Sequence, residues 1–160
     1  MQKAVYIYND EGASETAFFA LKTAFHAVDP TFRLVEINAA DIIKGKWRSQ
    51  ALALVMPGGA DLFYCQKLNG EGNRQIRKFV EQGGVYLGFC AGAYYGSSYC
   101  DFAYTVHPNK HYTIGPRELA FYPGHAVGPY LSPYKINSET GACVAKIEWL
   151  TDPKSSKKHK

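Results

Sequence analysis

The sequence lacks any apolar run that approaches the roughly 20 residues a membrane-spanning helix needs. It also lacks the features of a secretory signal at its beginning. Residues 1–9 hold one basic residue and a short apolar stretch, Asp10 and Glu11 follow at once, and no small-residue cleavage site is evident. We therefore expect no membrane attachment and a cytoplasmic location.

Metal-binding patterns are absent too. The chain has only four cysteines, none of them in Cys-x-x-Cys spacing, and no histidine pair completes a zinc pattern: Cys65, Cys90, Cys100 and Cys143. Scattered cysteines of this kind are usually reduced thiols. We expect no metal site and no cofactor.

The charge is only mildly basic, with 18 Lys and Arg against 14 Asp and Glu, a net +4. Part of the excess lies in the polar end, so we expect one domain over 1–150 and a disordered basic tail over 151–160. The rest is close to neutral and shows no basic face with interleaved aromatics, which argues against nucleic-acid binding. A small-molecule ligand is the expected partner, and a homodimer is an open alternative.

Strand-like and helix-like segments alternate along the first 95 residues. Strands are predicted over 4–8, 32–37, 51–56 and 85–89, and helices over 14–28, 73–81 and from residue 91. This order predicts an α/β fold with a mostly parallel central sheet and helices on both faces. Later segments, 102–106, 119–122 and 144–149, are predicted as further strands, antiparallel additions at the sheet edge.

Ligands of open parallel sheets sit beyond the carboxyl ends of the strands. Three predicted loops meet there: 9–12, 57–61 and 88–92. The last has the form Gly-x-Cys-x-Gly, in which flanking glycines permit a sharp strand-to-helix turn that lifts Cys90 into an exposed position. The helix end after it favours a thiolate, and the amide of Ala91 could steady an oxyanion. Gly58 and Gly59 are suited to supply a second amide.

Three segments then show a family resemblance: 57–61, 68–73 and above all 83–95, continued by 119–124 and 128–129. They resemble the N-terminal domain of eukaryotic biotin-protein ligases, which is similar to class I glutamine amidotransferases. The resemblance implies a flavodoxin-like three-layer sandwich and places Cys90 at the nucleophile position. It places Gly59 and Ala91 at the amide-donor positions, with Gly58 and Gly92 beside them. It also suggests a partner protein linked to biotin metabolism.

The chain departs from the amidotransferase pattern. Ala93-Tyr94 stands where the usual His-Gln pair would follow Gly92, and we expect the chain to end before the late His and Glu of the triad. It has no glycine- and arginine-rich biotin-adenylate loop, so biotin ligation by this chain alone is not expected.

Candidate partners of Cys90 come from several places. His125 lies in the glycine-rich segment 123–129, which we expect to be a loop, whereas His107 and His111 flank a turn and are expected to be exposed. Glu11 or Asp10 could share a proton with the thiol, as in the similar deglycase superfamily, and Glu118 is a weaker candidate.

Three functions stay open. The first is amide hydrolysis or acyl transfer on a small molecule by Cys90. The second is a catalytically inactive domain that binds a ligand or regulates a partner. The third is a deglycase-like or thiol-sensing protein that uses Cys90 with Glu11.

Overall fold

The computed structural model describes residues 3–102, 113–129 and 144. The chain divides into one compact unit over 1–128 and another over 129–160. Nearly all described residues belong to the first unit. The predicted tail over 151–160, and with it the domain boundary at 150, lies outside the described residues.

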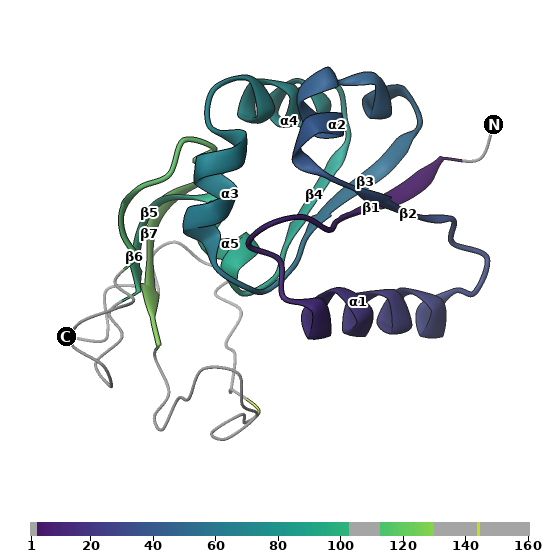
Figure 1. Cartoon of the computed structure of the whole chain (residues 1–160), viewed down its shortest axis with the longest axis horizontal. Coiled ribbons are helices and arrows are strands. Elements are labelled where there is room, and N and C mark those ends of the chain that lie inside the picture. The colour runs from purple at the N-terminus through teal and green to yellow at the C-terminus, as the bar shows by residue number, and fades with distance from the viewer. Residues whose placement is uncertain (1–2, 103–112, 130–143, 145–160) are drawn as a thin grey trace, which may run out of the picture. The chain divides into compact units, whose positions relative to one another are not determined.

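A four-stranded parallel sheet forms the centre of this unit (Figure 1). Its strands run in the order β2-β1-β3-β4, the flavodoxin-like order at this end of the sheet. Their bounds are β1 Ala4–Tyr8, β2 Leu34–Ile37, β3 Ala51–Met56 and β4 Val85–Gly88. The predicted α/β class and parallel sheet are therefore confirmed, with strand ends within two residues of those expected.

Alternate residues of the strands face two helical layers, as the strand period of two requires. One face, which includes Val5 and Val55, packs on α1 Glu15–Val28 through Phe18 and Leu21. The opposite face, which includes Tyr6 and Met56, packs under the remaining helices. Figure 1 shows α1 on one side of the sheet and α2 and α4 on the other. The further helices are α2 Ala39–Lys44, α3 Asp61–Leu68, α4 Glu71–Glu81 and α5 Ala91–Tyr95, with a 3-10 turn at Lys46–Ser49.

Helix α1 begins and ends where its sequence predicts. The Ser14 side chain accepts a hydrogen bond from the Ala17 amide, which is the usual N-cap contact, and Asp29 closes the helix before Pro30. In contrast, α2 and α3 were not predicted. They are short, and their apolar residues do not recur over enough turns to reveal a helical period.

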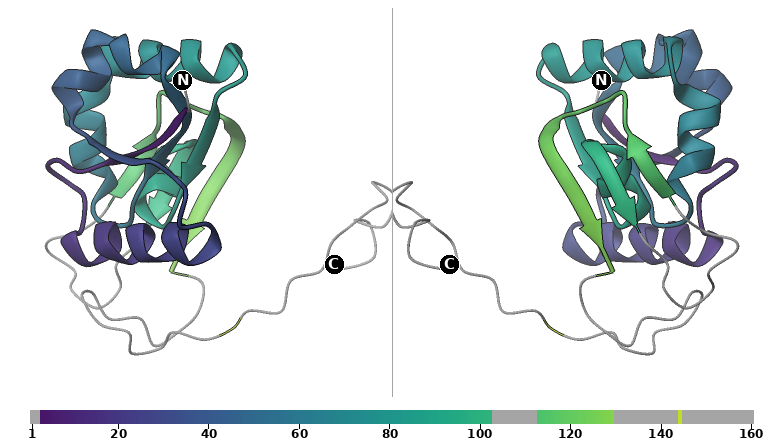
Figure 2. Two further views of the ribbon diagram at one scale, coloured as in Figure 1. Left: turned by 90° about the vertical axis from the view of Figure 1, so that its right-hand side faces the viewer. Right: turned by 90° about the vertical axis from the view of Figure 1, so that its left-hand side faces the viewer.

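A second sheet follows α5, in the order β6-β5-β7 (Figure 2). Its strands are β5 Ser97–Phe102, β6 Thr113–Pro116 and β7 Tyr122–Gly128. The expectation of antiparallel additions to the main sheet is wrong, because this sheet is separate and β5 pairs in parallel with β7. The strand expected over 119–122 has other bounds, because β7 begins at Tyr122. Of the strand expected over 102–106, only Phe102, the last residue of β5, lies within the described residues. The predicted strand over 144–149 lies outside the described residues except for Val144.

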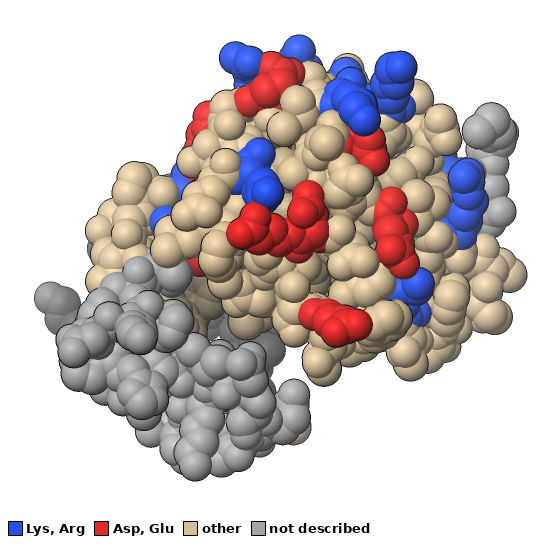
Figure 3. Space-filling model, in the orientation of Figure 1, with Lys and Arg blue, Asp and Glu red and all other residues tan. Residues whose placement is uncertain are grey.

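No helix in the described part of the chain combines the length and the apolar character that crossing a bilayer requires. Basic and acidic side chains are interspersed over the face shown in Figure 3.

Candidate functional site

Cys90 is the second of the two residues, Phe89 and Cys90, that connect β4 to α5. Its backbone has φ +50° and ψ −111°, a combination that costs a residue with a Cβ on the order of 1–3 kcal/mol. Ala120 is the other non-glycine residue with positive φ among those described. The Cys90 side chain is exposed to solvent. The chain therefore holds a thiol in a strained turn after the carboxyl end of β4, the strand at one edge of the four-stranded sheet.

Close packing of backbone against backbone fixes this turn. A Cβ atom on Gly92 would lie 2.2 Å from the carbonyl oxygen of Met56, the last residue of β3. The Phe89 amide donates to that same oxygen at 2.9 Å, and the Gly92 amide donates to the Pro57 oxygen at 3.1 Å. The turn at Cys90 is thus tied directly to the end of the neighbouring strand, an approach that only glycine at position 92 permits.

The loop after β3 lies against the thiol. A Cβ atom on Gly58 would lie 3.4 Å from the Cβ of Cys90 and 3.9 Å from its Sγ, so the two residues are close neighbours and a side chain at position 58 would touch Cys90. Gly59 follows with φ +151° and is exposed. The structure therefore brings together the five residues predicted for one site from two adjacent loops: Gly58, Gly59, Cys90, Ala91 and Gly92.

Two backbone amides at this junction have no acceptor. Within the described residues, neither the Gly59 amide nor the Ala91 amide donates a hydrogen bond, although their neighbours Ala60 and Gly92 both do. Backbone N–H groups without an acceptor can bind an anion or a developing oxyanion, and of the two residues Gly59 is exposed whereas Ala91 is buried. Ala91 is bonded directly to Cys90, and Gly59 is bonded to Gly58, which lies close to Cys90.

Aromatic residues support the loops from the core side. The Tyr64 hydroxyl donates to the Pro57 oxygen at 3.1 Å, and its ring packs edge-on against Tyr8 and Tyr95. Burial, with smaller contributions from neighbouring groups that include Cys90, raises the pKa of Tyr64 well above its usual range. The phenol therefore stays protonated and keeps donating to Pro57 at any physiological pH.

The acidic loop after β1 does not pair with the thiol through any contact in the described residues. The Glu11 carboxylate forms an ion pair with Lys67 on α3, at 2.9 Å between Oε2 and Nζ. Asp10 accepts hydrogen bonds from the amides of Glu11, at 2.7 Å, and of Ala39, at 3.0 Å. A role for Glu11 beside Cys90 stays a prediction.

His125 lies inside β7 and not in a loop, so that part of the prediction is wrong. Its backbone belongs to the parallel pairing of β7 with β5, where it is the partner of Tyr99. Its ring is exposed and stacks on that of Tyr99, with centroids 4.7 Å apart and planes at 28°. No contact in the described residues joins it to Cys90, and a catalytic role stays a prediction. His107 and His111 lie outside the described residues.

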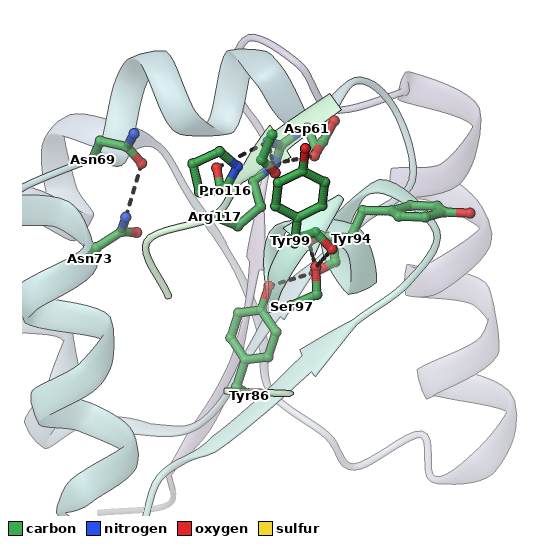
Figure 4. Close-up of polar contacts among 11 residues, drawn as sticks. Asp61, Asn69, Asn73, Tyr86, Tyr94, Ser97, Tyr99, Pro116 and Arg117 are labelled. Carbon is green, nitrogen blue, oxygen red and sulfur yellow. Dashed lines mark hydrogen bonds and ion pairs between the residues drawn. The ribbon is translucent and has the colours of Figure 1, made fainter. Parts of the chain in front are cut away.

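A buried ion pair near these loops was not predicted from the sequence. Arg117, after β6, donates to the carboxylate of Asp61, the first residue of α3, with 2.7 Å between Nε and Oδ2 (Figure 4). Arg117 also donates to the carbonyls of Gly115 and Pro116. Two isolated charged residues 56 positions apart carry no pattern that would mark them as partners.

Glu118, a weaker candidate partner of Cys90, is engaged in the same region of the fold. Its carboxylate accepts hydrogen bonds from the Gly70 amide at 2.7 Å and from the Asn73 side chain at 2.6 Å. It therefore holds the start of α4. The described residues contain no group of three or more His, Cys, Asp or Glu side chains that could hold a metal ion.

Comparison with known proteins gives a consistent result. The family description "Biotin-protein ligase, N terminal" matches residues 3–160. A biotin-protein ligase from Schizosaccharomyces pombe is 37% identical over 144 residues, which are 89% of this chain and 22% of the ligase. An uncharacterized protein from Chlamydia muridarum is 33% identical over 159 residues, 95% of this chain and 59% of that protein. The chain thus spans less than two thirds of either relative.

A solved structure, described as that of a peptidase E protein from Listeria monocytogenes, shares the fold with a TM-score of 0.51. The match covers 61% of this chain and 52% of that one at 18% identity, so it bears on the fold alone. With the family match over nearly its whole length, the chain belongs to the family of the biotin-protein ligase N-terminal domain, and its α/β fold is similar to that of the peptidase E structure.

Proposed function

We propose that Cys90 is a nucleophile that attacks the carbonyl carbon of an amide in a small molecule, for hydrolysis or acyl transfer. The observation that carries this proposal is the exposed thiol on a strained turn, close to Gly58 and flanked by two amides without acceptors. Proteins retain such backbone strain where the surrounding structure enforces it, and functional sites are the usual places. The turn would then act as a nucleophile elbow.

The proposed reaction follows from this arrangement. The sulfur of the Cys90 thiolate forms a bond to the carbonyl carbon, and the amides of Gly59 and Ala91 hold the oxyanion. The carbon–nitrogen bond then breaks, the nitrogen leaves as an amine with a proton taken from water, and a thioester remains on Cys90. Water or an acceptor amine attacks the thioester and restores the thiol. The products are a carboxylic acid or a new amide.

A second function is favoured by a different observation. In the described residues no imidazole or carboxylate contacts Cys90, because Glu11 pairs with Lys67 and His125 stacks on Tyr99. A nucleophile usually needs a base or a positive neighbour. Without one, the same junction would serve as a binding site for a ligand or for a partner protein, and the family relation to a biotin-protein ligase suggests a partner in biotin metabolism.

Alkylation by iodoacetamide separates the two functions. The rate at each cysteine is measured by mass spectrometry in the native protein and in a synthetic peptide of residues 85–95. We expect Cys90 to react at least about tenfold faster in the protein than in the peptide, because an activated nucleophile reacts faster than a free thiol. Cys65 should react slowly, because burial raises the pKa of its thiol to about 11.

The controls are Cys90→Ser and Glu11→Gln. Cys90→Ser should abolish the fast phase and leave the rate at Cys65 unchanged. Glu11→Gln should slow the reaction only if that carboxylate acts on the thiol, so an unchanged rate would remove the thiol-sensing alternative. Equal Cys90 rates in protein and peptide would contradict the proposed nucleophile and favour the binding domain.

A further inference from the structure

The loop between β1 and α1 clamps the segment that carries the Gly59 amide. The Ser14 amide donates to the Gly58 oxygen at 2.9 Å, and the Ala60 amide donates to the Gly12 oxygen at 2.8 Å. These two bonds form an isolated antiparallel bridge in which Ala13 lies opposite Gly59. A side chain at position 59 is excluded, because its Cβ would lie 1.9 Å from the Gly12 oxygen.

The bridge also determines where the Gly59 amide points. Ala13 and Gly59 form the pair that does not exchange hydrogen bonds, and in such a pair the backbone groups are directed away from the partner segment. The same follows from the Gly58–Gly59 peptide itself. In a planar trans peptide the N–H is antiparallel to the C=O, and the Gly58 C=O is held by Ser14. The Gly59 N–H therefore points away from the β1–α1 loop.

The Pro57–Gly58 peptide is also held by hydrogen bonds. The Pro57 oxygen accepts both the Gly92 amide and the Tyr64 hydroxyl, each at 3.1 Å. Gly58, which lies close to Cys90, thus has fixed peptides on both sides. The hydrogen bonds to the Pro57 oxygen restrain the preceding peptide and not the Gly58–Gly59 peptide. Rotation of the Gly58–Gly59 peptide would therefore break the hydrogen bond from the Ser14 amide to the Gly58 oxygen.

We infer that Ser14 is a positioning residue for the proposed oxyanion site and that it acts through its backbone N–H, not its hydroxyl. The hydroxyl has a separate task, because it accepts the Ala17 amide as the N-cap of α1. This inference rests on the proposed function of Cys90. It predicts that stabilisation of the oxyanion, which forms at the substrate's carbonyl oxygen, depends on the position of the start of α1, and that departure of the leaving group does not.

Ser14→Pro, compared with Ser14→Ala, tests the inference, because both variants lose the N-cap hydroxyl and only the proline variant also loses the N–H. Ser14 has φ −75°, which proline can adopt, but the proline ring removes the N–H and places Cδ where the hydrogen points at Gly58. The Gly58 carbonyl must then turn away and carry the Gly59 N–H with it. Glu15→Pro is the matched control. Glu15 is the exposed first residue of α1, a position that favours proline, and Ser14 with ψ 127° suits the residue before one.

Two reagents provide the readout at Cys90, both followed by mass spectrometry. Acetylation by p-nitrophenyl acetate passes through an oxyanion, whereas alkylation by iodoacetamide displaces iodide at a methylene carbon and does not. We expect Ser14→Pro to lower the ratio of acetylation to alkylation rates by about 10²-fold, the usual cost of losing one oxyanion donor. Ser14→Ala and Glu15→Pro should keep the wild-type ratio. A general loss of structure would slow or speed both reactions and leave the ratio near that of a free thiol peptide.

The outcomes distinguish the two proposals. If the wild-type ratio equals that of the peptide of residues 85–95, the oxyanion site itself is absent and the proposed function fails. If the wild-type ratio is raised but Ser14→Pro keeps it, the role of Ser14 is wrong and the function stands. Should Ser14→Pro not fold, amide hydrogen exchange in the native protein decides. A protected Ser14 amide with a fast-exchanging Gly59 amide supports the inference, and a protected Gly59 amide overturns it.

Discussion

At the scale of single residues, the site depends on backbone conformation more than on side-chain chemistry. Cys90 adopts φ +50°, which glycine would adopt at less cost, and the chain nevertheless carries a thiol there. The Gly-x-Cys-x-Gly spacing, in which the glycines are Gly88 and Gly92, was enough to predict a sharp turn at Cys90. The partners of Glu11 and His125 could not be predicted, because Lys67 and Tyr99 come close only through tertiary structure.

If Cys90 is strained, glycine at this position should be stabilising. We expect the free energy of unfolding of Cys90→Gly to be about 1 kcal/mol higher than that of Cys90→Ala. The relief of about 1–3 kcal/mol of backbone strain exceeds the cost of the added entropy of the unfolded chain. Urea unfolding followed by circular dichroism measures the difference.

The matched pair is Cys65→Gly and Cys65→Ala. Cys65 lies within α3, where glycine should be less stable than alanine by about 1 kcal/mol, so the sign reverses. If Cys90→Gly proved less stable than Cys90→Ala, the turn would not be strained.

At the scale of elements, periodicity and turn residues revealed the longer units. The continuous apolar run Ala51–Met56 became the buried strand β3, and the apolar spacing before Asp29 became α1. The short helix α2 was not predicted, because its six residues span fewer than two helical turns. Its signals were local ones: the Asn38 side chain caps the Asp41 amide, and Gly45 ends the helix with φ +72°.

The start of α2 also depends on Asp10, which accepts the Ala39 amide. Burial raises the pKa of Asp10. The hydrogen bonds from the Ala39 and Glu11 amides and the charge of Lys67 together lower it by more, so the pKa of Asp10 lies below its usual 3.8. A lowered pKa in the folded state stabilises the fold above the usual pKa, and the contribution is lost as the pH falls through the folded value.

The stability difference between wild type and Asp10→Asn should therefore depend on pH. We expect it to be largest near pH 7 and to shrink below about pH 4, as Asp10 becomes protonated in both states. Urea unfolding at a series of pH values measures it. A difference that stays constant from pH 7 to pH 3 would show that the Asp10 charge does not hold α2.

At the scale of the molecule, a parallel sheet presents two loops at its carboxyl edge while a second, separate sheet follows α5. The sequence predicted the first arrangement, because alternating strands and helices permit few topologies. It could not predict the second sheet. Directly after β6 of that sheet, Arg117 forms a buried ion pair with Asp61 of α3. Loss of one partner of such a pair would leave a buried charge, at a cost of about 3–5 kcal/mol.

The most direct test of Cys90 as a nucleophile is the site of acetylation by p-nitrophenyl acetate in the intact chain, mapped by mass spectrometry after digestion. We expect the acetyl group to form first on Cys90, ahead of the other three cysteines, and we expect release of p-nitrophenol at this rate to disappear in Cys90→Ser. Acetylation of Cys90 no faster than in the peptide of residues 85–95 would contradict this expectation.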